Sequence, residues 1–123
     1  MDKLLLVGTG GFIGANTRYL FGIWLMQIFG NRFPVATLVI NLTGSFMLGF
    51  FLTWAAGRTS LPEQTRLLIA TGFCGGYTTF STYAFESITL LRGGEATAAL
   101  VYIIGTNLLC LVAVAAGMML AGR

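Results

Sequence analysis

The sequence predicts an all-α membrane protein with four transmembrane helices, the third of them broken near its middle. Hydrophobic residues fill 56% of the 123 positions and charged residues only 9%, whereas soluble domains are about 25% charged. Four apolar segments, at about 4–29, 35–56, 65–91 and 96–121, occupy nearly the whole chain. Each is long enough for the roughly 20 residues that a membrane helix needs. We therefore expect residues 1–123 to form a single integral membrane domain.

The first segment carries a face of small residues. Gly11, Gly14, Ala15, Arg18 and Gly22 recur at spacings of three and four, which places them on one side of a helix. Small side chains there allow another helix to approach closely. Two interpretations are open for Arg18, which lies well inside the segment. It is either an arginine that snorkels to the membrane interface or a buried cation that attracts anions or binds a partner subunit.

The second segment carries a polar and small stripe at helical spacing, formed by Thr37, Asn41, Gly44, Ser45 and Gly49. A carboxamide surrounded by hydrocarbon must find hydrogen-bond partners. Asn41 therefore either joins helices or donates its amide hydrogens to a dehydrated anion.

The third segment is interrupted at 72–83, where three glycines, three threonines, one serine and four aromatic residues share twelve positions. Glycine costs about 1 kcal/mol in a helix interior, and a break at membrane depth is tolerated only inside protein or beside a polar cavity. Such breaks indicate ion or substrate sites. We expect unwinding from Gly75 to Thr78, with freed carbonyls suited to a small hard cation. We expect Phe80 and Tyr83 to offer positive ring edges to an anion.

The fourth segment carries Tyr102, Thr106 and Cys110 on one face, at spacings of four. Near the end of the third segment, Glu86 is either an interfacial carboxylate or one that lines a gate. The segments also share hydrogen-bond donors: Thr37, Asn41, Ser45, Thr78, Thr79, Ser81, Thr82, Tyr83, Tyr102 and Thr106. Because donors and a buried arginine occur without carboxylates at the segment centres, the pattern favours an anion over a cation.

Composition argues against several other functions. Histidine is absent, and all four acidic residues lie near segment ends, so the chain is predicted not to be an enzyme of the triad or paired-carboxylate type. Cys74 and Cys110 lie in different segments and form neither a redox pair nor a transition-metal motif. The net charge of +3 is too small and scattered to indicate nucleic acid.

The distribution of basic residues gives a weak topological signal. With four spans, one side of the membrane holds Lys3, Arg58, Arg66 and Arg123, and the other holds Arg32 and Arg92. This bias favours cytoplasmic termini, but it is shallow enough to suit a protein that inserts in both orientations.

Three stretches resemble the Fluc (CrcB) family of fluoride channels: residues 10–19 (GGFIGANTRY), 37–44 (TLVINLTG) and 72–83 (GFCGGYTTFSTY). The resemblance covers essentially the full chain. It implies a fluoride-specific channel that passively exports fluoride from the cytoplasm and lowers its toxicity. It also implies an antiparallel, dual-topology homodimer in the bacterial inner membrane, with a structural sodium ion at its centre.

The resemblance further implies roles for single residues. Main-chain carbonyls of Gly75 and Thr78 would hold the sodium ion. The fluoride path would be lined by Asn41, Phe80, Tyr83, Ser81, Thr82, Tyr102 and Thr106, with Arg18, Thr37, Thr79 and Glu86 in support. Tyr83 departs from the phenylalanine usual in the family, and Cys110 stands where the family often has a hydroxyl residue.

Two other functions compete with the fluoride channel. A small four-span multidrug/proton antiporter needs a carboxylate in its first span, and the chain has no acidic residue between Lys3 and Glu63. A non-transporting membrane assembly subunit would account for the stripes of small residues. It would not account for the broken third segment or for the concentration of donors.

Overall fold

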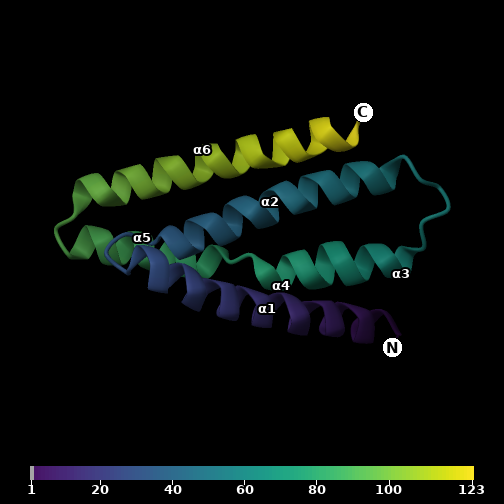
Figure 1. The fold of residues 1–123 in the computed structure, drawn as a ribbon, viewed down its shortest axis with the longest axis horizontal. Coiled ribbons are helices and arrows are strands. Elements are labelled where there is room, and N and C mark those ends of the chain that lie inside the picture. The colour runs from purple at the N-terminus through teal and green to yellow at the C-terminus, as the bar shows by residue number, and fades with distance from the viewer. Residues whose placement is uncertain (1) are drawn as a thin grey trace.

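Residues 2–123, which a computed structural model describes, fold into helices joined by short connections. In chain order these are α1 (Asp2–Phe29), α2 (Val35–Ala56), α3 (Glu63–Arg66), the π-helix η1 (Leu67–Cys74), α4 (Gly75–Tyr77), α5 (Phe80–Arg92) and α6 (Ala96–Ala121). Both termini lie at the same end of the molecule (Figure 1). The predicted all-α class is confirmed.

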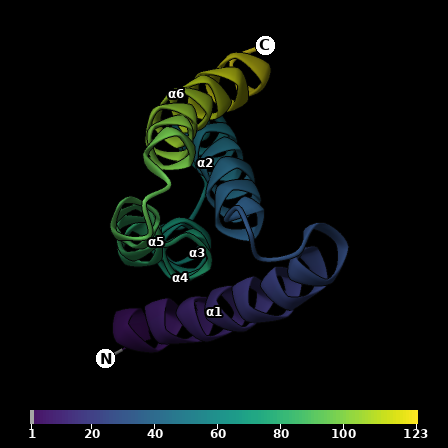
Figure 2. The same cartoon turned by 90° about the vertical axis from the view of Figure 1, so that its left-hand side faces the viewer.

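Among residues 2–123, two helices are long and apolar enough to cross a membrane: α2, with 22 residues and a mean hydropathy of 1.9, and α6, with 26 residues and 2.3. They pack along each other, and α1 lies on the other side of the molecule (Figure 2). Turns separate the helices sharply. Gly30 after α1 and Gly94 before α6 have φ of +75° and +80°, which glycine adopts without steric cost.

Glycines let α1 approach η1 and α4 backbone to backbone. Gly10 and Gly14 of α1 are buried. A Cβ added to Gly10 would lie 2.8 Å from the backbone nitrogen of Phe73, and one added to Gly76 would lie 2.6 Å from the carbonyl oxygen of Gly11. These distances are too short for any side chain. The two helices therefore meet through small residues spaced four apart, as close membrane-helix pairs do.

The close contact on α1 is centred one residue away from the expected face. Gly14, which the sequence predicts on this face, is buried, and the second buried glycine is Gly10 rather than Gly11. A Cβ on Gly11 would lie 3.8 Å from the Gly72 carbonyl oxygen, an ordinary contact. The spacing rule identified the correct side of the helix but not its centre, because the position of the partner helix decides which glycine lies deepest.

The α2–α6 pair uses the same packing. A Cβ on Gly49 would lie 2.5 Å from the carbonyl oxygen of Val114, and one on Gly117 would lie 2.8 Å from the backbone nitrogen of Phe50. On the expected stripe of α6, Tyr102 is 1% exposed. Gly49 of the predicted α2 stripe thus faces α6, whereas Thr37, Asn41 and Gly44 face the segment from Tyr77 to α5. Polar residues of α2 and α6 nevertheless line one common pocket.

We predict that Gly10→Ala destabilises the fold by about 1–3 kcal/mol, since the added methyl group must displace backbone atoms of η1. Gly8→Ala is the matched control, because a Cβ there meets nothing within 4 Å and alanine is the better helix former by about 1 kcal/mol. Thermal unfolding followed by circular dichroism in detergent micelles measures both. Equal melting temperatures for the two variants would contradict the packing described for α1.

Candidate functional site

The helical backbone is interrupted between α4 and α5. Thr78 (φ −82°, ψ 161°) and Thr79 (φ −151°, ψ 115°) are extended, so the regular ladder of hydrogen bonds cannot continue across them. The expectation that unwinding begins at Gly75 is wrong, because Gly75–Tyr77 is helical. Gly76 serves instead for the close approach to α1. The glycines of this stretch are used for packing, and the change of direction falls on the threonines.

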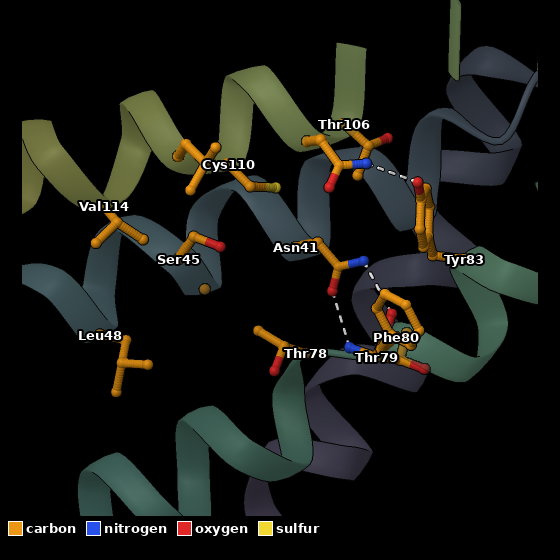
Figure 3. A pocket seen from close by; sticks show the side chains of 13 residues that line it. Asn41, Ser45, Leu48, Thr78, Thr79, Phe80, Tyr83, Thr106, Cys110 and Val114 are labelled. Carbon is orange, nitrogen blue, oxygen red and sulfur yellow. Dashed lines mark hydrogen bonds between the residues drawn. The ribbon is translucent and has the colours of Figure 1, made fainter. Parts of the chain in front are cut away.

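The side chain of Asn41 in α2 holds the extended residue Thr79 from both sides. Its Nδ2 donates to the Thr79 carbonyl oxygen at 2.9 Å, and its Oδ1 accepts from the Thr79 amide at 2.8 Å (Figure 3). A backbone N–H must face an oxygen, which fixes the orientation of the carboxamide. Asn41 thus replaces the two helical partners that Thr79 lacks, and it ties α2 to the break.

Thr79 and Thr78 use their own hydroxyl groups to end the flanking helices. The Thr79 hydroxyl accepts a hydrogen bond from the Thr82 amide at 3.3 Å and so caps the start of α5, a contribution of about 1 kcal/mol for a good N-cap. The Thr78 hydroxyl donates to the Cys74 carbonyl oxygen at 2.9 Å, closing the last turn before the break. The residue types at the break thus satisfy much of the backbone that it exposes.

The carbonyl groups around the break differ in their partners. Gly76 O accepts from Arg18 Nε of α1 at 3.2 Å, so the partly buried cation lies at the C-terminal end of α4, where the helix dipole favours positive charge. Within residues 2–123, the carbonyl oxygens of Gly75 and Thr78 accept no hydrogen bond across the break. Two main-chain oxygens therefore remain available as ligands.

A pocket of about 340 Å³ opens beside the break, between α2, α6 and the start of α5 (Figure 3). Its lining residues are Asn41, Gly44, Ser45, Leu48, Thr78, Thr79, Phe80, Tyr83, Thr106, Asn107, Cys110, Leu111 and Val114. None of these lining residues carries a formal charge. The pocket combines amide and hydroxyl groups with two aromatic rings, Phe80 and Tyr83, whose centroids lie 5.5 Å apart.

Four of the residues expected along the fluoride path line this pocket: Asn41, Phe80, Tyr83 and Thr106. The Thr106 hydroxyl is buried and has no hydrogen-bond partner among the described residues. A buried hydroxyl without a partner is costly, and here it belongs to a residue of the pocket wall. The Thr106 hydroxyl thus lies in the pocket wall as a donor without a partner among the described residues.

The other expected path residues lie next to the pocket. Ser81 and Thr82 are exposed in the first turn of α5, and the Thr79 hydroxyl donates to Thr82 Oγ1 at 3.0 Å. Tyr102 packs against Tyr83 with ring centroids 5.3 Å apart. Its buried hydroxyl has no partner within residues 2–123.

Glu86 of α5 is held by a hydroxyl group of α2. Thr37 Oγ1 donates to Glu86 Oε1 at 2.5 Å, and both groups are partly buried. The carboxylate thus joins α2 to α5 beyond the pocket. Neither residue is among those that line it.

Asn107 is a pocket residue that the sequence analysis did not identify. It donates to the Tyr83 hydroxyl oxygen at 2.8 Å. The predicted stripe of α6 runs from Tyr102 through Thr106 to Cys110, and Asn107 lies about 100° around the helix from Thr106. Asn107 could have been found by the criterion applied to Asn41, because a carboxamide in an apolar helix requires hydrogen-bond partners.

Residues 2–123 form an all-α protein with two helices that are both long and apolar enough to cross a membrane, and with a pocket rich in hydrogen-bonding groups beside a backbone break. Residues 5–118 match the family described as CrcB-like protein, Camphor Resistance (CrcB). The chain belongs to this CrcB family. Together with the two long apolar helices, this membership identifies a membrane protein.

Curated relatives resemble the chain over nearly its whole length. The protein of Rhizobium meliloti (strain 1021) is 41% identical over 120 residues, which cover 98% of this chain and 96% of the relative. That of Prosthecochloris aestuarii is 45% identical over 120 residues, covering 98% and 93%. That of Chlorobium chlorochromatii is 47% identical over 103 residues, covering 84% and 79%. Each is named "Fluoride-specific ion channel FluC".

We predict that Asn41→Leu lowers the free energy of unfolding by about 2–5 kcal/mol, because it leaves the amide and carbonyl groups of Thr79 without partners. Amide hydrogen exchange at Thr79 should accelerate more than exchange in the middle of α6. Asn16→Leu is the matched control, since the Asn16 amide donates only to the Phe12 carbonyl of its own exposed helix turn. Unchanged protection of Thr79 in Asn41→Leu would refute the role of this side chain at the break.

Proposed function

We propose that this protein is a fluoride-specific channel that lets fluoride leave the cytoplasm passively and so lowers its toxicity. The observation that carries the proposal is the uncharged pocket, which offers amide, hydroxyl and aromatic groups beside a backbone break. The names of the full-length relatives point to the same ion. A passive channel needs no catalytic group and no energy coupling. Hydrogen fluoride enters cells as a neutral acid, ionises inside, and the anion then leaves down its gradient.

The pocket suits a small, strongly hydrated anion. Water removed from fluoride must be replaced by donors at short range, as selectivity filters do for their ions. One of the two Asn41 amide hydrogens goes to Thr79, which leaves the second for a ligand. The unpartnered Thr106 hydroxyl is a further donor, and the edges of Phe80 and Tyr83 are electropositive. A narrow path lined by such donors would reject a larger anion such as chloride.

The remaining expected path residues extend the same chemistry. Ser81, Thr82 and Tyr102 would continue the row of hydroxyl donors away from the pocket. Arg18, Thr37, Thr79 and Glu86 would act in support, by holding the break and joining α5 to α2, as their hydrogen bonds allow.

The working form is proposed to be an antiparallel, dual-topology homodimer in the bacterial inner membrane. In this arrangement α1, α2, the combined α3–α5 segment and α6 each cross the bilayer. Large apolar side chains are exposed on the single chain, including Phe12 at 71%, Phe80 at 78% and Leu111 at 68%. Apolar surface of this extent indicates contact with lipid or protein. A second copy and the bilayer would cover it.

A structural sodium ion is proposed at the centre of the dimer, held by the main-chain carbonyls of Gly75 and Thr78. The support is that these oxygens accept no hydrogen bond across the break within residues 2–123. Carbonyl oxygens suit a hard cation. When bound, the ion would supply positive charge near the anion path, while α1 holds the preceding helices in place through Gly10 and Gly14.

Liposomes that contain the purified protein should release fluoride rapidly while they retain chloride. An ion-selective electrode measures both anions, with empty liposomes as the background. Equal release of the two anions, or fluoride release no faster than the background, would overturn the proposed function.

Phe80→Ile and Asn41→Asp should each abolish fluoride release while leaving a dimer. The first removes the ring edge, and the second places a negative charge beside the anion path and the Thr79 carbonyl. Fluoride release is compared with the oligomeric state from light scattering. Wild-type rates in both variants would remove these two residues from the path.

Replacing sodium with a large organic cation throughout purification should destabilise the dimer, because an ion that binds only the assembled form stabilises it. Light scattering after gel filtration reports the change. An assembly that is equally stable without sodium would argue against the central ion.

A further inference from the structure

Tyr83 and Asn107 form a hydrogen-bonded pair inside the pocket. Asn107 Nδ2 lies 2.8 Å from the Tyr83 hydroxyl oxygen and 2.7 Å from the carbonyl oxygen of Ile103 in its own helix. Both side chains belong to the pocket wall. The pair joins α5 to α6 at the second aromatic position of the pocket.

The direction of this hydrogen bond is determined by its chemistry. An amide nitrogen carries two hydrogens and accepts none. One hydrogen points to the Ile103 carbonyl, so the other is donated to the tyrosine. The Tyr83 oxygen is therefore the acceptor, and the hydroxyl hydrogen of Tyr83 is not used in this hydrogen bond. Within residues 2–123 no group accepts that hydrogen.

The tyrosine ring is held too firmly to turn its hydroxyl elsewhere. Tyr83 is only 8% exposed. Its ring packs against Phe80 on one side and Tyr102 on another, with centroids 5.5 and 5.3 Å away. The hydroxyl end of Tyr83 is partly buried. A donor there without a protein acceptor needs a ligand or water, and no lining residue of this pocket is a carboxylate.

We propose that the Tyr83 hydroxyl donates a hydrogen bond to the permeating anion, and that Asn107 is the positioning residue that directs its hydrogen into the pocket. This inference rests on the proposed function and deepens it. It assigns the extra hydroxyl of Tyr83 to recognition of a small anion by direct donation. Asn107 acts only through Tyr83.

The test is a double-mutant cycle of Tyr83→Phe, Asn107→Leu and the double variant, reconstituted in liposomes. The measured quantity is the fluoride concentration that half-saturates fluoride flux, with fluoride as the only permeant anion. Tyr83→Phe should raise it by roughly ten- to 150-fold, the range for one hydrogen bond to a charged group. Asn107→Leu should raise it by a similar or smaller factor. When Tyr83→Phe is already present, Asn107→Leu should add nothing, because its effect passes through the hydroxyl.

Two matched controls exclude general effects of the substitutions. Tyr19→Phe and Asn16→Leu make the same chemical changes on exposed positions of α1 outside the pocket. Both should keep the wild-type half-saturating concentration. Gel filtration verifies that every variant retains the wild-type assembly.

Two kinds of result would overturn the inference. If the wild-type protein releases fluoride but Tyr83→Phe half-saturates at the same concentration, the hydroxyl takes no part in recognition. If Asn107→Leu has the same effect in the Tyr83→Phe variant as in the wild-type protein, Asn107 acts by packing alone. A wild-type protein that releases no fluoride would instead overturn the proposed function, and this inference with it.

Discussion

Backbone that leaves the helix inside an apolar segment must find new hydrogen-bond partners, and the rest of this structure depends on how that is achieved at Thr78 and Thr79. The Asn41 carboxamide supplies both partners of Thr79, and Arg18 binds the carbonyl of Gly76. Because these groups come from α2 and α1, the break is held from two sides. The same arrangement leaves main-chain oxygens and hydroxyl groups without partners, and these are the groups available to ions.

Much of the fold could be predicted from the sequence. The apolar run of α2 lies between Pro34 and Gly57, and that of α6 lies between Gly94 and Gly122. Proline and glycine at these positions made the limits of both helices predictable. The exact position of the break could not be predicted. Glycine propensity is a local property, whereas Gly76 packs against α1, which is distant in the sequence. A helix contact that forms only in the folded protein decided which residues of the stretch stayed helical.

The site was predictable in its residue types more than in its details. A carboxamide and aromatic rings in apolar segments indicated Asn41, Phe80 and Tyr83, and all three line one pocket. Sequence could not reveal that Asn41 donates one amide hydrogen to the backbone. Nor could it pair Tyr83 with Asn107, because that contact depends on how α5 and α6 are rotated toward each other.

The donors beside this break are proposed to carry fluoride and to reject larger anions. The most direct test of this proposal is the reversal potential of the reconstituted protein in a planar bilayer, with fluoride on one side and an equal concentration of chloride on the other. We expect a large reversal potential with the sign set by the fluoride gradient, since fluoride alone carries current. A reversal potential near zero would mean that both anions pass equally and would contradict the proposal.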